Sequence, residues 1–426
     1  MSLGIVLGFF VLAAIGMPIA FALGVTALIA TAWSGIDFNM IPQRMMHAVN
    51  SFPLISIPFF MLAGEIMIKA NMMERLIDLA NAVVGRVRGG LAHVTMLSAA
   101  GLSTVSGSAV SDASALASIL VPSMRKAYEP GFAAAVVAAA GNLGPIIPPS
   151  GAMIVYAFMA GPTVSVAGLF MAGVVPGLIM TFGMMGMCSY FAHKRNYPYT
   201  GEAFRFSKVW YELRRSWIIF LMPVVVIGGI VGGAFTATEG AAIAVVYALG
   251  IGFFVTRTLT LRDLPPALVR AAVTSAMVGA MIAFASAVSY LVTIDLLPQK
   301  LATLVQSITS SPIVFLLLVA GVLIVADMFL ESNAAYIMLV PLLHPIALQY
   351  GIDPLHFAFL FVFNLVIGML TPPVGVVLFV VVGITGIHMN EVIKHIWPFI
   401  VFMYALLLAC MFFPGIVTWF PRLLGY

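Results

Sequence analysis

The chain has 426 residues, of which 62% are hydrophobic and only 8% are charged, and its formal net charge is +4. A soluble domain carries about 25% charged residues, so this composition excludes a water-exposed surface for most of the chain. The apolar stretches reach the roughly 20 residues that a helix needs to cross a bilayer, and they lack the alternation of a membrane β-barrel. The composition therefore predicts an all-α polytopic membrane protein.

The first hydrophobic unit, residues 3–33, carries Gly16-Met17-Pro18 near its middle, so it is either one bent span or two short ones. It lacks the basic start of a cleaved signal peptide, and we expect it in the mature protein. Residues 38–50, which follow, are an amphipathic arm or a plain loop. The remaining units span 53–70, 91–120, 131–160, 165–192, 217–235, 237–256, 271–295, 313–340, 356–386 and 398–420.

The basic residues predict which side of the membrane each loop faces. Loops 193–215 and 257–270 are rich in Lys and Arg and are expected in the cytoplasm. If units 91–120 and 313–340 each enter and leave on one face, all lysines and arginines except Arg44, Lys300 and Arg422 lie inside. The charges thus predict two re-entrant hairpins that open to opposite faces, a cytoplasmic N-terminus and a C-terminus outside.

An internal repeat supports this arrangement. Asn142–Gly151 resembles Asn364–Gly375, and alignment of their Pro-Pro pairs matches Gly144 with Gly368. Upstream, alignment of Val121-Pro122 with Val340-Pro341 places Asp112 on Glu331. Each half reads as a hairpin followed by a helix broken at Pro-Pro, and the two halves are inverted, a common plan of secondary transporters.

The breaks suggest a cation site. A Pro-Pro pair removes two N–H donors and frees carbonyls, which persist in a membrane only where protein or a cavity satisfies them. Free carbonyls and hydroxyls suit a hard cation such as Na⁺, and helix N-termini suit an anion. The alternatives without a binding role are simple proline kinks, serines that only allow close helix packing, and structural roles for Asp112, Asp327 and Glu331.

Ordered motifs along nearly the whole chain resemble those of the large membrane subunit of TRAP transporters. These motifs are Phe52–Glu65, Gly107–Ala113, Ala138–Ser150, Gly161-Pro162, Leu169–Gly177, Thr236–Gly240 and Ile367–Gly375. The resemblance implies an inverted-repeat elevator-type transporter that couples Na⁺ entry to import of an organic acid across the bacterial inner membrane. It also implies a small DctQ-like membrane subunit and a periplasmic DctP-like substrate-binding protein as partners, with no cofactor besides the coupling ion and no nucleic acid.

The resemblance further implies which residues form the sites. One Na⁺ is expected at Ser103, Ser106, Gly107, Ser108, Asn142, Gly144, Pro145 and Pro148. The other is expected at Asp327, Ser332, Asn333, Thr371, Pro372 and Gly375. Substrate is expected between the hairpin tips, at Ser108, Asp112, Ser150, Glu331 and Asn364.

The same plan divides the chain into scaffold and transport parts. The expected parts are a scaffold at 1–90, a first transport repeat at 91–164, scaffold helices and the start of the second repeat at 165–295, a second transport repeat at 296–386, and a C-terminal helix at 387–426.

Three other functions compete with this one. An intramembrane protease needs a catalytic dyad or a His-Glu-x-x-His site; the zinc motif is absent, and Ser106 and Asp112 have no evident partner base. A stand-alone carboxylate carrier of the same superfamily would share the fold. A channel fits poorly with paired inverted sites, which suit alternating access, and no Walker-type glycine loop exists for ATP hydrolysis.

Overall fold

The computed structural model describes residues 2–199, 204–327, 332–372 and 375–426. Within these ranges the chain is helical and contains no β-sheet, which confirms the all-α prediction. Glu331 and Pro373, both named in the sequence analysis, lie outside the described residues.

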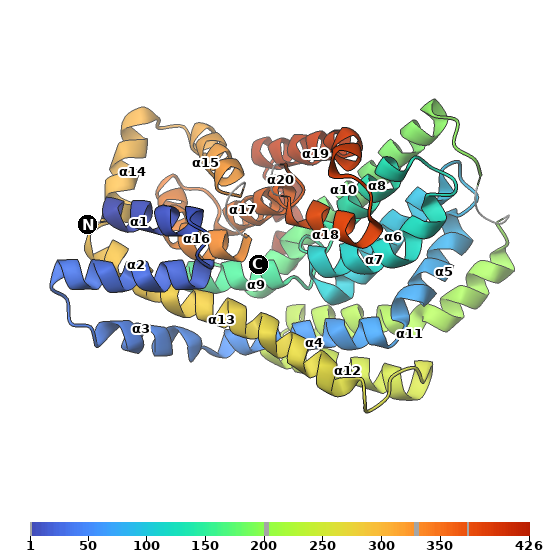
Figure 1. The fold of residues 1–426 in the computed structure, drawn as a ribbon, viewed down its shortest axis with the longest axis horizontal. Coiled ribbons are helices and arrows are strands. Elements are labelled where there is room, and N and C mark those ends of the chain that lie inside the picture. Colours follow the sequence, from blue (N-terminus) through green and yellow to red (C-terminus); the bar gives the residue numbers. More distant parts are fainter. Residues whose placement is uncertain (1, 200–203, 328–331, 373–374) are drawn as a thin grey trace.

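The N-terminal unit forms two short helices, α1 (Ser2–Ala14) and α2 (Ile19–Ser34), which pack against each other in opposite directions (Figure 1). The chain reverses at Gly16, whose φ of +93° favours glycine. Residues 38–50 contain a helix, α3 (Met40–Val49), and not a plain loop. The guanidinium of Arg44 on α3 lies 3.8 Å from the ring centre of Tyr290.

The helices form two groups. The first group, which we call the frame, consists of α2, α3, α4 (Ser56–Lys69), α11 (Phe206–Val231), α12 (Ala237–Gly250) and α13 (Leu264–Ile294). Figure 1 shows the helices of the frame along one long side of the molecule. A six-residue π-helix, Ile251–Thr256, extends α12.

The second group contains the predicted transport repeats, 91–164 and 296–386, together with neighbouring helices. Its first half runs through α5 (Met72–Val84), α6 (Gly90–Ser106), α7 (Ala109–Met124), α8 (Pro130–Gly141), α9 (Gly151–Ala160) and α10 (Val166–Lys194). The second runs through α14 (Leu297–Ile308), α15 (Pro312–Asp327), α16 (Ser332–Gln349), α17 (Pro354–Gly368), α18 (Val376–Thr385) and α19 (Met389–Phe412). A short helix, α20 (Gly415–Leu423), follows.

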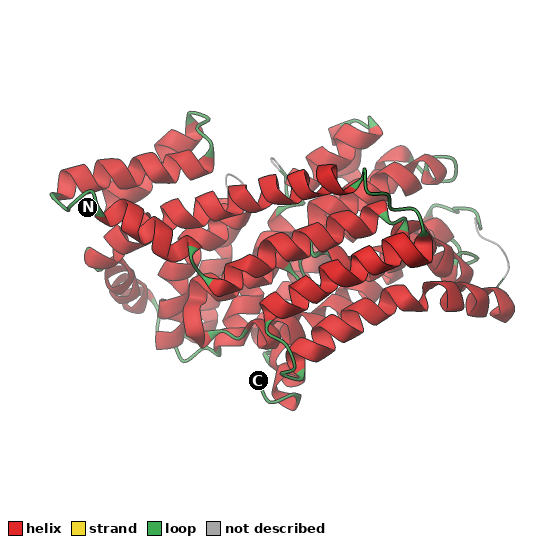
Figure 2. Ribbon diagram, turned by 90° about the horizontal axis from the view of Figure 1, so that it is seen from below, coloured by secondary structure: helices red, strands yellow, loops and turns green. Residues whose placement is uncertain are grey.

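Each repeat contains a helical hairpin and a broken helix, as the sequence predicts. Hairpin 1 is α6 with α7, and hairpin 2 is α15 with α16; in each, the first helix is incoming and the second outgoing. Break 1, residues 142–150, separates α8 from α9. Break 2, residues 369–375, separates α17 from α18, and its residues 373 and 374 are not described. Figure 2 shows the same helices from below.

The two repeats interlock. The outgoing helix of each hairpin packs against the second half of the other repeat's broken helix, so that α7 lies against α18 and α16 against α9. The first halves, α8 and α17, form the core: residues 131–141 and 356–368 are all buried. Alanine is the commonest residue of α8, and phenylalanine is the commonest residue of α17.

The position of α10 differs from the predicted division of the chain. The sequence analysis placed 165–295 together, but α10 packs against α6, α9, α17, α19 and α20. A hydrogen bond of 2.7 Å joins His93 Nε2 on α6 to Ser189 Oγ on α10. In this packing α10, α19 and α20 accompany the hairpins and broken helices, and we call this whole second group the hairpin group.

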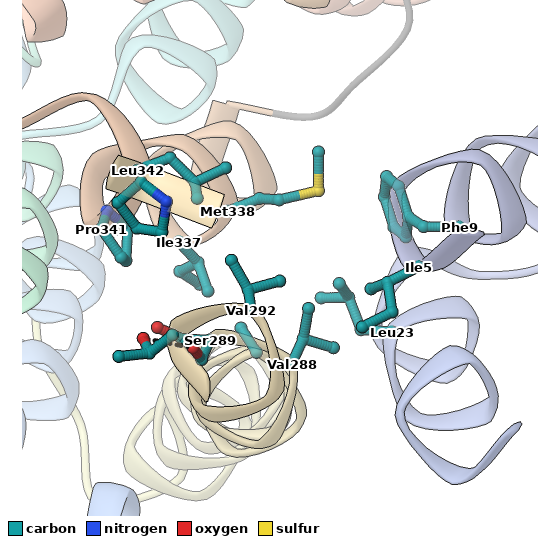
Figure 3. A pocket seen from close by; sticks show the side chains of 13 residues that line it. Ile5, Phe9, Leu23, Val288, Ser289, Val292, Ile337, Met338, Pro341 and Leu342 are labelled. Carbon is teal, nitrogen blue, oxygen red and sulfur yellow. Dashed lines mark hydrogen bonds between the residues drawn. The ribbon is translucent and has the colours of Figure 1, made fainter. Parts of the chain in front are cut away.

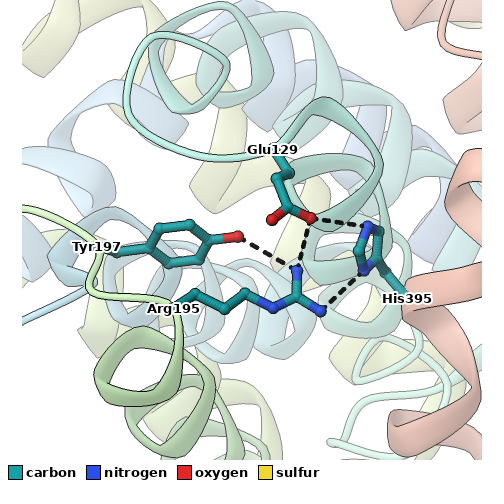
Figure 4. Close-up of polar contacts among 4 residues, drawn as sticks. All are labelled: Glu129, Arg195, Tyr197 and His395. Atoms are coloured by element: carbon teal, nitrogen blue, oxygen red, sulfur yellow. Dashed lines mark hydrogen bonds and ion pairs between the residues drawn. The ribbon is translucent and has the colours of Figure 1, made fainter.

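A polar cluster fastens one end of the hairpin group (Figure 4). Arg195 Nη1, at the end of α10, lies 2.9 Å from Glu129 Oε2, just before α8, and its Nη2 lies 3.1 Å from His395 Nδ1 on α19. His395 Nε2 is 3.2 Å from the same Glu129 oxygen, and Tyr197 lies 3.3 Å from Arg195 Nη1. We call these four residues the Arg195 cluster; it connects three helices at their ends.

The frame meets hairpin 2 through an apolar pocket (Figure 3). Its walls come from α1, α2, α13, the start of α14 and α16. The side chains labelled there are Ile5, Phe9, Leu23, Val288, Ser289, Val292, Ile337, Met338, Pro341 and Leu342. Nearly all of them are apolar, so this contact between the two groups has little directional bonding.

The helices fit a membrane protein that crosses the bilayer several times. In the described part of the chain, five helices are long and apolar enough to cross a membrane, or six if α14 and α15, bent by 120°, form one span. The shorter apolar helices belong mainly to the hairpins and broken helices. Crossing helices and half-length helices together are what an inverted-repeat transporter fold requires.

Candidate functional site

The first candidate site lies at the tip of hairpin 1, around the fully buried carboxylate of Asp112. Ser106 Oγ at the end of α6 donates to Asp112 Oδ1, and Ser103 Oγ lies 3.2 Å from Asp112 Oδ2. Ser103 Oγ also lies 2.7 Å from the carbonyl of Ala99. A carboxylate with only hydroxyl partners is costly to bury, so this site would gain from a cation.

The turn of hairpin 1 is built by Gly107 and Ser108. Gly107 ends α6 with φ +59°, a conformation that glycine adopts without strain. Ser108 begins α7, and its hydroxyl accepts the backbone N–H of Ser111 at 3.4 Å. The turn packs on break 1, since a side chain on Gly107 would meet Pro149 and Ser150. These residues therefore shape the tip and bring it against the break.

Gly144 is the point where break 1 meets Asp112. A Cβ on Gly144 would lie 2.8 Å from Asp112 Oδ2 and 2.8 Å from the backbone carbon of Ser108. Only glycine therefore allows the break to approach the buried carboxylate this closely. The backbone of break 1 and the carboxylate of Asp112 therefore lie side by side, although the sequence analysis assigned Asp112 to the substrate and Gly144 to an ion.

Asn142 connects break 1 to break 2. Its Nδ2 donates to the carbonyl of Val366 at 2.6 Å, one of the last carbonyls of α17, which the helix end leaves without an intrahelical partner. This bond fixes the orientation of the Asn142 amide, so that its Oδ1 points away from the carbonyl of Val366. Within the described residues, that buried Oδ1 receives no hydrogen bond. It is an amide oxygen of the kind that coordinates hard cations.

The second candidate site lies at break 2, around Asp327 at the end of α15. Asp327 is 6% exposed, and Ser332 Oγ, at the start of α16, lies 3.4 Å from its Oδ1. A side chain on Gly368 would collide with the Asp327 carboxylate. Asp327 thus lies against Gly368 in the same way as Asp112 lies against Gly144. The Val-Pro alignment pairs Asp112 with Glu331, which lies outside the described residues; the acid that meets Gly368 in the structure is Asp327.

Asn364, Thr371 and Tyr404 lie around the second site. Asn364 Nδ2 donates to the carbonyl of Ala320 on α15 at 3.1 Å, and its buried Oδ1, like that of Asn142, has no donor among the described residues. Thr371 Oγ1 donates to the carbonyl of Ile367 at 3.0 Å. Tyr404 lies on α19, and its buried hydroxyl has no hydrogen-bond partner among the described residues. The sequence analysis missed Tyr404; its one signal is a tyrosine within an apolar helix.

The other predicted site residues lie in the breaks and tips. Ser150 is fully buried, donates to the carbonyl of Pro145 at 2.7 Å and caps α9 by accepting the N–H of Met153, so its hydroxyl supports the backbone. Of the rest, Pro148 lies in break 1, Asn333 in the first turn of α16, and Pro372 and Gly375 in break 2.

A second polar group, absent from the sequence analysis, joins the two repeats. His344 on α16 lies between Tyr156 on α9 and Thr163 just after α9. Nothing in the spacing of the seven histidines along the sequence indicates this contact, because its members are 181 and 188 residues apart.

Comparisons with known proteins were made for the whole chain. The sequence model of one family, "Tripartite ATP-independent periplasmic transporter, DctM component", matches residues 6–416. The sialic acid TRAP transporter large permease protein SiaM of Vibrio cholerae is 36% identical over 428 residues, 99% of each chain. The 2,3-diketo-L-gulonate TRAP transporter large permease protein YiaN of Escherichia coli is 36% identical over 407 residues, 95% of each chain.

Two further similarities concern a longer relative and a solved structure. The isethionate TRAP transporter permease protein DctMQ of Oleidesulfovibrio alaskensis is 35% identical over 421 residues, which are 98% of this chain but 66% of that one. The crystal structure of the Alcanivorax borkumensis YdaH transporter, described as having an unusual topology, superposes with a TM-score of 0.61 at 15% identity, covering 89% of this chain and 88% of that one. At this identity the likeness shows the fold alone.

Proposed function

Because this chain belongs to the DctM component family of tripartite ATP-independent periplasmic (TRAP) transporters, we propose that it carries an organic acid across the bacterial inner membrane together with Na⁺. The observation that carries this proposal is the pair of buried aspartates, each against a matched glycine of a helix break. Each aspartate has hydroxyl neighbours, and the side-chain oxygens of Asn142 in break 1 and of Asn364 on α17 lack a donor within the described residues.

Two features support a cation as the coupling species. A bound Na⁺ would offset the cost of burying Asp112 and Asp327, and oxygen atoms are the ligands that hard cations prefer. We assign one Na⁺ to hairpin 1 with break 1 and another to hairpin 2 with break 2. The organic acid would lie between the hairpin tips, near the helix N-termini at Ser108 and Ser150.

The partners and the type of movement follow the family. Relatives named for sialic acid, diketogulonate and C4-dicarboxylate support an organic acid as substrate. The longer DctMQ relative supports a small membrane partner, and the family name supports a periplasmic binding protein. Movement of the hairpin group against the frame would alternate access to the site. The N-terminus in the cytoplasm and the C-terminus outside remain part of the proposal.

Uptake into proteoliposomes tests this function. The chain, its small membrane partner and candidate binding proteins would be combined, and uptake of labelled sialic acid, C4-dicarboxylates and related acids measured with and without an inward Na⁺ gradient. We expect uptake only with the gradient and the matching binding protein. Equal uptake without Na⁺ would refute the coupling, and uptake by this chain alone would favour a stand-alone carrier.

A further inference from the structure

We propose that His344, with Tyr156 and Thr163, is a positioning clip that ties hairpin 2 to the broken helix of the first repeat and thereby sets the affinity of the second site. The inference rests on the proposed Na⁺-coupled transport and goes beyond it, because none of these three residues belongs to a predicted ion or substrate site. We call the three residues the His344 clip.

Two polar contacts hold His344 in the clip. Its Nδ1 lies 2.9 Å from the hydroxyl of Tyr156, and its Nε2 lies 3.0 Å from Thr163 Oγ1. Thr163 Oγ1 is also 3.2 Å from the carbonyl of Ala160. The contacts therefore run from Tyr156 through His344 to Thr163 and the end of α9.

The Tyr156–His344 contact of the clip is buried at a point where α16 lacks backbone hydrogen bonds, whereas Thr163 is exposed. Tyr156 is fully buried, His344 is 2% exposed, and both rings contact phenylalanines of α17. Pro341 and Pro345 flank His344 and cannot donate to the carbonyls of Ile337 and Pro341 one turn earlier. A helix that lacks two adjacent backbone bonds bends easily, so a side-chain bond at this point controls the direction of hairpin 2.

The inverted counterpart of this contact is different. Where α7 lies against α18, the polar link is Arg125 Nη1 to the carbonyl of Thr385 at 3.3 Å, and it is exposed. Hairpin 1 is instead held by close glycine contacts, since a Cβ on Gly141 would lie 2.7 Å from the Cβ of Ala113. Hairpin 1 is thus fixed by packing, whereas the hydrogen bonds of the clip are available to fix hairpin 2.

The position of hairpin 2 matters because it carries Asp327 and Ser332 to Gly368. If the clip is removed, α16 can shift relative to α9 without unfolding. The second site then exists for a smaller fraction of the time, and the apparent affinity for its ligand falls by that fraction. One lost buried hydrogen bond corresponds to roughly tenfold in such an equilibrium.

The experiment compares Tyr156→Phe and His344→Gln with Tyr247→Phe in the reconstituted complex. Tyr247 is the matched control because its hydroxyl donates to the carbonyl of Ile218 at 2.6 Å, wholly within the frame. Two quantities are measured: the half-saturating Na⁺ concentration for uptake, and hydrogen–deuterium exchange of α16 and α7. We expect the two clip variants to raise the half-saturating Na⁺ about tenfold and to speed exchange in α16 but not in α7.

The control variant should change neither quantity, and the Tyr156→Phe, His344→Gln double variant should be no worse than the more affected single variant. An unchanged half-saturating Na⁺ concentration, or unchanged exchange in α16, would overturn the clip while leaving the proposed function intact. If uptake by the unmodified protein did not depend on Na⁺, the proposed function would fail, and the exchange data would show whether the clip exists. Should His344→Gln not fold, Tyr156→Phe alone decides, since it removes one oxygen only.

Discussion

In hairpin 1 the serines lie on the incoming helix and the aspartate on the outgoing helix, whereas in hairpin 2 the aspartate is incoming and the serine outgoing. Both arrangements nevertheless place a carboxylate against the matched glycine of a break. The repeats therefore share a contact in space without sharing the order of residues along the chain.

This difference teaches what the repeat preserves. The geometry around the break, with an acid, a hydroxyl and a glycine, is common to both halves, while the helix that supplies each group is not. It follows that the two sites should respond alike to changes at the acid and differently to changes in the surrounding packing. The predictions below test that statement.

The largest effect is expected from the two aspartates. Asp112→Asn and Asp327→Asn each remove the charge that would hold a cation, so uptake should fall by about 10- to 100-fold at low Na⁺. Glu331→Gln should have a smaller effect, because Asp327 already occupies the place of Asp112. Na⁺-dependent uptake in proteoliposomes measures all three. A larger loss in Glu331→Gln than in Asp327→Asn would restore the alignment made from sequence.

Substitution of Gly144 or Gly368 by alanine should abolish transport in both cases but lower the unfolding free energy by different amounts. In Gly144→Ala the new methyl meets the backbone of Ser108, which cannot move away, so unfolding free energy should fall by about 1–3 kcal/mol and transport should be lost. In Gly368→Ala the three nearest atoms all belong to the Asp327 side chain; rotation moves its carboxylate away, and its Cβ, 2.7 Å from the new methyl, needs only a small shift of the end of α15. Transport should be lost with less destabilisation. Thermal unfolding in detergent, measured beside uptake, would contradict this account if both variants lost the same stability.

The hydrogen bond from Asn142 to the carbonyl of Val366 should contribute more to stability than the bond from Asn364 to the carbonyl of Ala320. Asn142→Ala leaves the carbonyl of Val366 without its donor and should lower the unfolding free energy by about 1–3 kcal/mol. Asn364→Ala removes a longer bond, 3.1 Å instead of 2.6 Å, and should cost less. Denaturation of the two purified variants gives the order, and the reverse order would show that the breaks are not braced through Asn142.

The Arg195 cluster lies outside both candidate sites, so its loss should affect stability and not the Na⁺ dependence of transport. Arg195→Met should lower the unfolding free energy by about 1 kcal/mol, since Glu129 is partly exposed and such pairs are screened. The half-saturating Na⁺ concentration should not change. A shift in Na⁺ dependence without a change in melting temperature would mean that this cluster takes part in transport.

The smallest effect concerns pH at Asp353, which caps α17 outside the membrane-spanning segments. Burial raises the pKa of Asp353, but the hydrogen bond from Arg422 and two backbone N–H groups together hold it below the ordinary value of 3.8. Its stabilising contribution is present above that value and is lost as pH falls through the lowered pKa. Asp353→Asn should therefore be about 1 kcal/mol less stable than the unmodified protein at pH 7. The difference should shrink as the pH is lowered below 3.8, as unfolding measured over a series of pH values would show.

Periodicity, charge and the Pro-Pro motifs were enough to predict the hairpins, the broken helices and their inverted order, because each depends on local sequence. The matched pair Gly144 and Gly368 was also visible in the sequence. The partner of Gly368 was not, because the order of acid and hydroxyl is exchanged between the hairpins. The place of α10, the Asn142–Val366 bond and the His344 clip depend on residues far apart in sequence, which one sequence does not pair.

The most direct test of the two-site account is the number of Na⁺ ions bound by the purified chain at equilibrium, measured with a radioactive tracer. We predict two ions per chain for the unmodified protein and one for each of Asp112→Asn and Asp327→Asn. Unaltered binding in both variants would contradict the claim that the buried aspartates beside the two breaks hold the coupling ions.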